Sequence, residues 1–539
     1  MQGEEYIASA EEGRAPSIAK STAKMSVATT FSRATGFIKA MALAIAIGTG
    51  PIADAFHTAN VMPSILFELV MGGILGSVII PVYVQYLTEK RDDETRYMIS
   101  NLTNIIFTLG AILSFLGVIF APYLVQLITI QDPSKATPLM IFFFRIFALK
   151  IMFYALAAVF AGVLNSQRRF TIPMAAPIFN NLVVIITVFG LYVPFSESNP
   201  QFALAALAIG TMMGVVTMAA VQIPSAIKLG LRPRLIFNLR HPAVKLVAKL
   251  GLPMLGFAVT TQINTIIIYQ LLQPYSKGPA AYTYALAFFQ LPYAIFAVSI
   301  ITAIFPELAR FANSKDFQSF KKTLSLGMRA TSFITIPSAI FMAIMAKPII
   351  SLTLEYGKFD VASTKITSEV LTSFAFALIV FSLYNMLTRV YYSLQDTKTP
   401  LKIGAISVPL QVAFNFLLIG ILGVRGLPLA YALALTFAVI VQLYVLRRKI
   451  GPLGVSFILR AMAKQLVAAV PAGVAMYLVY QSIESLELSR MAGLTTEIAG
   501  AAGIGFVIYI GLALLLRVEE VDFIRKLSKK FVRTKVNPT

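Results

Sequence analysis

The sequence predicts an all-α protein that crosses a membrane many times. Of its 539 residues, 58% are hydrophobic and only 13% are Asp, Glu, Lys or Arg, whereas soluble domains carry about 25% charged residues. The apolar residues come in stretches of about 20 or more, long enough to cross about 30 Å of hydrocarbon as helices. A transmembrane β-barrel would instead show strands of about 10 residues with alternating polarity.

About fourteen such stretches follow one another along the chain. They cover approximately residues 26–48, 55–87, 101–128, 138–163, 172–195, 201–227, 246–272, 280–309, 320–346, 364–393, 401–421, 427–446, 458–481 and 494–516.

The connecting segments predict the orientation. Basic clusters such as Arg447-Arg448-Lys449 follow the even-numbered spans, whereas the opposite loops hold mostly single cations such as Lys135 and Lys277. Because cytoplasmic loops collect Lys and Arg, we expect a multi-pass protein of a cytoplasmic membrane with both termini in the cytoplasm. The net charge of +21 then reflects topology and contact with membrane lipids, and we expect no nucleic-acid partner.

The ends and the rare residue types exclude several classes. The first 25 residues are polar and lack the apolar core of a signal peptide, so we expect a cytoplasmic tail. The chain has no Cys and only two His, which argues against disulfides, thiolate chemistry and a His-based metal site. No Gly-Lys-Ser/Thr phosphate loop occurs. We therefore expect a protein that is not an enzyme and needs no cofactor.

A faint internal repeat predicts two similar halves. Pro81, late in the second span, recurs as Pro306 in the eighth, and Ser166 and Pro173 recur as Ser393 and Pro400. Both offsets match a shift of six helices, which indicates parallel repeats with a substrate site between them. The predicted divisions are a polar tail (1–25), an N-terminal lobe (26–228), a C-terminal lobe (229–450), two further helices (451–518) and a basic tail (519–539).

Charges inside the apolar spans are the candidate functional residues, because each costs about 3 kcal/mol to insert. They concentrate in the first half, as Arg33, Lys39, Asp54, Glu68, Arg145 and Lys150. Cations on a bent first helix would suit a phosphate group entering from the cytoplasm. The alternative is that Arg33 reaches the interface or pairs with Asp54 or Glu68. We expect Asp54 and Glu68 to orient or neutralise the cations rather than to contact an anion. The core of the second half is predicted to be nearly uncharged and to carry amides such as Asn264, Gln411 and Asn415.

Several motifs resemble the lipid II flippase family, also called MurJ or MviN. They include Ser32-Arg33-Ala34-Thr35-Gly36-Phe37, Ala53-Asp54-Ala55-Phe56, Gly72-Gly73, Gly162-Val163-Leu164-Asn165-Ser166, Gln290-Leu291-Pro292-Tyr293 and Tyr392-Ser393-Leu394-Gln395-Asp396-Thr397-Lys398-Thr399-Pro400. The last is the most specific, and the resemblance runs from about residue 26 to residue 450.

The resemblance implies a fold and a function. Family members belong to the multidrug/oligosaccharidyl-lipid/polysaccharide exporter superfamily, with two six-helix lobes around a central cavity and two extra helices forming a groove for a lipid tail. They move the undecaprenyl-linked peptidoglycan precursor from the inner to the outer leaflet of the bacterial inner membrane, for cell-wall synthesis, and cell-wall synthesis proteins are possible partners. By position, Arg33 and Asp54 match residues implicated in diphosphate recognition, Lys39 stands where many members have Arg, and Arg145 matches an Arg of the fourth helix.

The sequence departs from the family at other positions. Many members have an Arg pair and a Glu in the second helix, where this chain has Phe67, Glu68 and Gly72, and an Arg in the eighth, where it has Ala287. Some members bind sodium through carboxylates, whereas this chain offers only Asn264, Gln411 and Asn415 as weak candidates. The alternative functions are a flippase for another polyprenyl-linked oligosaccharide, a cation-coupled drug exporter, and a membrane scaffold without transport.

Overall fold

The computed structural model confirms the predicted class. It describes residues 29, 31–69, 92–135, 137–167, 169–229, 234–484 and 489–521, and within these ranges every regular element is a helix. Ten apolar segments of the described chain are long enough to cross a membrane, and Lys398–Ile450, at 53 residues, holds two helices of 25 residues each. A total of fourteen crossings stays a prediction. The polar tail, Gly72-Gly73, Pro81 and most of the basic tail lie outside the described residues.

The helices divide into two compact units with a boundary between Ala280 and Ala281. Unit 1 begins with a helix over residues 31–47. It continues with α2 (Pro51–Phe67), α5 (Asp92–Ile119), α6 (Ala121–Ile128), η2 (Pro133–Lys135), α7 (Pro138–Ala148), α8 (Lys150–Ser166), α9 (Thr171–Thr187), η3 (Val188–Tyr192), α10 (Val193–Phe195), α11 (Pro200–Ala220), α12 (Ile223–Lys228) and α13 (Pro242–Leu272).

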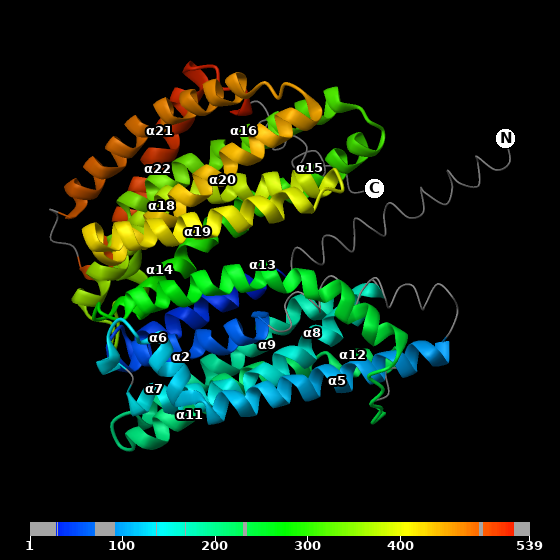
Figure 1. The fold of residues 1–539 in the computed structure, drawn as a ribbon. Helices are drawn as coiled ribbons and strands as arrows, with labels where there is room; N and C mark the ends of the chain where they lie inside the picture. Colours follow the sequence, from blue (N-terminus) through cyan, green and yellow to red (C-terminus); the bar gives the residue numbers. More distant parts are fainter. Residues whose placement is uncertain are drawn as a thin grey trace, which may run out of the picture. The chain divides into compact units, whose positions relative to one another are not determined.

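Unit 2 contains the remaining helices, drawn in green to red in Figure 1. They are α14 (Gly278–Pro292), whose first residues belong to unit 1, η4 (Tyr293–Ala297), α15 (Val298–Asn313), α16 (Phe317–Ile344), α17 (Ala346–Leu354), α18 (Val361–Ser393), α19 (Lys398–Leu422), η5 (Gly423–Arg425), α20 (Gly426–Ile450), α21 (Val455–Glu484) and α22 (Arg490–Leu515).

The boundary between the units falls later in the chain than the predicted lobe boundary at residue 228. Helix α13 packs on α2 and α6, and its amides fix this contact. Gln270 Nε2 donates to the carbonyl of Leu127 at 2.8 Å, and Gln273 Nε2 donates to Thr58 Oγ1 at 3.2 Å. Side-chain packing therefore places α13 with unit 1, whereas the six-helix repeat remains a prediction.

The helix type changes at several places. The second helix passes from α to π geometry at Glu68, and the eighth passes into the π-helical turn η4 at Tyr293. The two positions are separated by the same interval as Pro81 and Pro306. A third π-helical turn, η3, has no counterpart at the same interval in α19, so the repeat stays a prediction.

Local sequence explains where the helices begin. Thr137 caps α7 by accepting a hydrogen bond from the backbone N–H of Met140 at 3.2 Å, and Pro138 follows in the first turn. Asp316 and Asp360 cap α16 and α18 through the N–H groups of residues three positions later. Such caps satisfy N–H groups that have no partner inside the helix.

The motif with the most specific family resemblance folds as a capped turn between α18 and α19. Asp396 accepts hydrogen bonds from the backbone N–H and the hydroxyl of Thr399, at 3.0 and 2.6 Å, and pairs with Lys449. Desolvation opposes ionisation of Asp396, but these hydrogen bonds outweigh it and lower its pKa to about 2. The motif therefore fixes the turn that joins two helices.

The helices α16, α21 and α22 pack closely in unit 2 (Figure 1). A methyl group added at Gly473 of α21 would lie 2.6 Å from Ile340 of α16, and one at Gly505 of α22 would lie 1.9 Å from Met476 of α21. Small residues at these points let the helix backbones approach one another, as is common in membrane proteins.

Candidate functional site

Lys150 is the most deeply buried of the predicted site residues. Helix α7 ends at Ala148 and α8 begins at Lys150, so the chain breaks its helix just before this side chain. Lys150 is 1% exposed. Its Nζ donates to Asn60 Oδ1 of α2 and lies 4.1 Å from the centre of the Phe147 ring. A buried ammonium needs such partners, because leaving water is costly for a charge.

Aromatic packing fixes the surroundings of Lys150. The ring of Phe56 meets the rings of Phe143 and Phe147 edge to face, with centroids 5.6 and 5.3 Å apart. These contacts join α2 to α7 and hold Asn60 and Lys150 on neighbouring helices. The sequence analysis missed Asn60, although a polar residue in the apolar span that begins at residue 55 was an available signal.

Lys39 and His57 complete the surroundings of Lys150 in unit 1. Lys39 lies half-buried in the helix over residues 31–47 and interacts electrostatically with Lys150, and the buried His57 is within range of the Lys39 ammonium. We call Lys39, His57, Asn60 and Lys150 the unit 1 cluster. Its excess of positive charge would be relieved by a bound anion.

Three other predicted residues are exposed on unit 1: Arg33, Glu68 and Arg145. Arg33 stands about 9 Å along its helix from Lys39. Its helix is held against α9 by Asn181, whose Nδ2 donates to Thr35 Oγ1 at 3.1 Å. The structure therefore brings Lys39 and Lys150 together and leaves Arg33, Glu68 and Arg145 on the surface of the unit.

Asp54 binds the backbone. Its two carboxylate oxygens accept hydrogen bonds from the N–H groups of Lys277 and Ala280, at 3.0 and 3.1 Å. These N–H groups stand at the start of α14. A carboxylate there accepts hydrogen bonds from otherwise unpaired donors and interacts favourably with the positive end of the helix dipole. Neither the expected role beside the cations nor the diphosphate role implied by the resemblance includes this contact, because the two segments are more than 220 residues apart.

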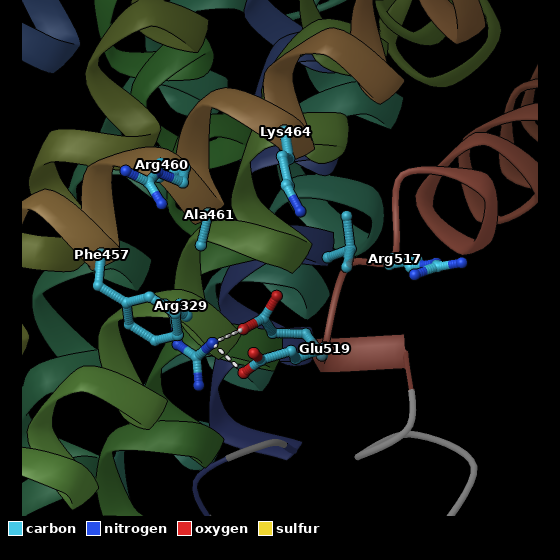
Figure 2. Close-up of a pocket in the computed structure, with 9 residues that line it drawn as sticks. Arg329, Phe457, Arg460, Ala461, Lys464, Arg517 and Glu519 are labelled. Carbon is cyan, nitrogen blue, oxygen red and sulfur yellow. Dashed lines mark hydrogen bonds and ion pairs between the residues drawn. The ribbon is translucent and has the colours of Figure 1, made fainter.

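The prediction of a nearly uncharged core in the second half is wrong at Arg329 of α16. This side chain is 8% exposed. Its Nη1 lies 2.6 Å from Glu519 and 3.0 Å from Glu520, and Figure 2 shows the guanidinium facing the two carboxylates. Gln465 Nε2 of α21 donates to Glu520 at 3.2 Å. The signal was available, since Arg329 lies inside the predicted span 320–346.

The weak sodium candidates are divided between the units. Gln411 and Asn415 are buried one turn apart on α19 of unit 2, whereas Asn264 lies on α13 of unit 1. Among the described residues, no group of three or more His, Cys, Asp or Glu side chains is arranged to hold a metal ion. The three amides stay weak sodium candidates.

Comparisons with known proteins agree on one family. The family model described as "Lipid II flippase MurJ" matches residues 43–491. The chain is 28% identical over 532 residues to a "Probable lipid II flippase MurJ" of Rhizobium meliloti, covering 95% of this chain and 97% of the relative. It is 26% identical over 409 residues to the "Lipid II flippase MurJ" of Burkholderia cenocepacia, covering 75% and 78%.

Solved structures share the fold. A structure described as "Lipid II flippase MurJ, inward closed conformation" matches with a TM-score of 0.76 and 24% identity, covering 92% of this chain and 98% of that one. An inward-facing multidrug transporter of the MATE family, in the MOP superfamily, matches with a TM-score of 0.64 and 14% identity, covering 77% and 94%.

Proposed function

The chain belongs to the lipid II flippase MurJ family, and from this premise we propose that it moves lipid II, the undecaprenyl-diphosphate-linked peptidoglycan precursor, from the inner to the outer leaflet. It is a multi-pass protein of the bacterial inner membrane and a member of a transporter family. Its substrate is lipid-linked, and its surroundings are membrane lipids. The orientation with both termini in the cytoplasm, and contacts with cell-wall synthesis proteins, belong to the proposal.

The unit 1 cluster carries the proposal. Lys150 is held by the neutral Asn60 and the Phe147 ring and is repelled by Lys39. Its charge is therefore not cancelled by a carboxylate in these contacts. A diphosphate carries two negative charges and several acceptor oxygens, which suits two ammonium groups in a setting of low dielectric constant. Arg33, on the same helix as Lys39, would meet the headgroup first.

Asp54 has a different role in this proposal. By capping α14, its carboxylate ties α2 to the start of the helix in which unit 1 ends and unit 2 begins. The basic-loop pattern puts this contact on the outer side of the membrane. We infer that the contact fixes the start of α14 to α2 within unit 1.

The two last helices would accommodate the lipid tail. Large apolar side chains of α21 and α22, among them Val467, Val470, Leu478, Phe506 and Val507, are exposed on unit 2. A polyprenyl chain could lie on these surfaces while its diphosphate enters the protein, because both the chain and these side chains are apolar and suited to the lipid environment. The headgroup alone would then need a polar path.

Depletion of the protein in its own host tests the function. We expect lipid II to accumulate in the inner leaflet and to be lost from the outer leaflet before growth stops. Accumulation of a different polyprenyl-linked oligosaccharide, with normal lipid II distribution, would support the alternative flippase instead. Normal distribution of all such precursors, with a changed export of cationic drugs, would support the drug exporter that the MATE-like fold leaves open.

A further inference from the structure

A polar cavity lies entirely within unit 2, between α16 and the start of α21. Its volume is about 450 Å³. It is lined by Gln318, Lys321, Lys322, Ser325 and Arg329 of α16 and by residues 452–454 and Phe457 after α20. We call it the α16 cavity. The α16 residues recur every three or four positions, so they share one face of the helix.

The lining of the α16 cavity is positively charged. It contains Lys321, Lys322 and Arg329 and no Asp or Glu. Glu519 and Glu520 contact Nη1 of Arg329, so they compensate one of the three cations. The two lysines, one half-buried and one exposed, leave the cavity open to an anionic ligand.

Two buried polar atoms at the cavity are without partners. The hydroxyl oxygen of Ser325 and Nε of Arg329 are shielded from solvent, and neither makes a hydrogen bond within the described structure. The residues stand four positions apart, on the same face of α16. Buried polar groups are nearly always hydrogen-bonded, and both can donate to a phosphate oxygen.

The loop that closes the cavity begins and ends with glycine, at Gly451 and Gly454. Gly451 and Gly454 have φ angles of +84° and +66°, which favour glycine. A methyl group at Gly451 would lie 3.2 Å from Lys321 Nζ, whereas one at Gly454 would meet nothing within 4 Å. The backbone at Gly451 thus passes close to Lys321, and there is free space beside Gly454.

The outer edge of the cavity is apolar. Phe457 is 46% exposed, and its ring lies 4.6 Å from the Arg329 guanidinium, beside which it is drawn in Figure 2. Leu459, two residues later, is 58% exposed. A basic pocket beside exposed apolar side chains at a helix end is typical of sites that bind lipid headgroups.

We propose that the α16 cavity binds the phosphate headgroup of an anionic phospholipid, with its acyl chains against Phe457 and α21. Lys321 and Lys322 neutralise the phosphodiester, and the Ser325 hydroxyl and Nε of Arg329 donate to its oxygens. The phosphodiester chemistry is shared with free phosphate, but the apolar edge favours a lipid. The site consists of unit 2 residues only, and the proposal does not depend on which precursor the protein moves.

Native mass spectrometry of the full-length protein in detergent, titrated with dioleoyl phosphatidylglycerol, tests this site. We expect one lipid to be retained per protein, in preference to dioleoyl phosphatidylcholine. The double variant Lys321→Gln/Lys322→Gln should weaken retention about tenfold or more, as expected for lost charge-assisted contacts. The matched control Lys398→Gln/Lys402→Gln removes two exposed lysines from the start of α19 and should leave retention unchanged.

A second variant separates the cavity from general surface charge. Ser325→Val keeps all charges, removes the hydroxyl and reduces the space, and should also weaken retention. Equal losses in the two lysine double variants, equal retention of phosphatidylcholine, or full retention by Ser325→Val would overturn the proposal. Competition by millimolar inorganic phosphate would assign the cavity to free phosphate and overturn the lipid assignment. Monodisperse elution of each variant without added lipid confirms that it is folded.

Discussion

Lys150 and Asn60 form one contact, but their removal should affect stability differently. In Lys150→Met, a buried ammonium is replaced by an apolar side chain of similar length. In Asn60→Ala, the ammonium remains buried and keeps only the Phe147 ring, 4.1 Å away. We expect Lys150→Met to fold with nearly normal stability and to lose transport, whereas Asn60→Ala loses stability first.

The magnitudes follow from burial. Lys150 is 1% exposed, so Asn60→Ala removes a hydrogen bond to a buried charge and should cost about 1.5–3 kcal/mol. Lys150→Met leaves the Asn60 oxygen unpaired, which costs about 1–3 kcal/mol. It also removes the burial cost of the ammonium and its repulsion by Lys39, and apolar replacements of buried charges are often neutral or stabilising by about 1–4 kcal/mol. Its net effect should be about 1 kcal/mol or less.

Stability and transport require separate measurements. The chain has no Trp and no Cys, so tryptophan fluorescence and thiol-reactive dyes are unsuitable, and the fraction surviving heating is measured by size-exclusion chromatography. Transport is measured as inner-leaflet accumulation of lipid II in depleted cells that carry each variant. A lost phosphate contact of about 1.5–3 kcal/mol corresponds to about a ten- to hundredfold loss of affinity.

Two results would refute this reasoning. If Lys150→Met restored transport at normal protein level, the ammonium would not be part of the substrate site. If Lys150→Met destabilised the protein as much as Asn60→Ala, Lys150 would be a structural cation. The double variant Lys150→Met/Asn60→Leu serves as a control, since removing both polar partners should be nearly neutral for stability.

Three further predictions address the other charges and the driving force. Arg33→Ala should abolish transport with little loss of stability, because Arg33 is exposed; growth of depleted cells measures this, and full complementation at normal expression would contradict it. Glu520 is 2% exposed, so Glu520→Gln should cost about 1–3 kcal/mol of stability. Glu519 is 63% exposed, so Glu519→Gln should cost about 1 kcal/mol or less. Equal shifts in heat survival of the two variants would argue against the ion-pair geometry. A membrane potential that is negative inside favours outward movement of a headgroup with two negative charges by about 2.3 kcal/mol per charge per 100 mV. Flipping in vesicles should therefore stop when the potential collapses and should survive replacement of sodium by potassium. Strict sodium dependence at constant voltage would contradict this and would implicate Asn264, Gln411 and Asn415.

The sequence predicted the fold class well because hydrophobicity is a local property. A span such as 320–346 is recognisable from its own residues, and α16 covers it. Helix starts were also readable, as Thr137-Pro138 shows. The packing of α13 with unit 1 was not, because it depends on contacts such as that between Gln273 and Thr58, which are 215 residues apart.

The sequence predicted which charged residues would belong to the candidate site, but not how their side chains would be arranged. The cost of burying charge singled out Lys39 and Lys150, and the structure brings them together. The same rule could not tell which partner each charge finds. Asp54 meets backbone N–H groups at the start of α14, which no side-chain pattern reveals. Arg329 was overlooked although the same rule applies to it, because it is a charge inside the predicted span 320–346.

The Arg329 ion pairs also bear on the order of events during biosynthesis. Arg329 precedes Glu519 by 190 residues, an interval of about 10 to 40 s at translation rates of about 5–20 residues per second. During that interval the guanidinium of α16 has entered its surroundings without its two carboxylates. A chain truncated before residue 519 would retain this uncompensated cation in its interior. Arrival of Glu519 and Glu520, which follow α22, therefore completes the charge compensation of Arg329.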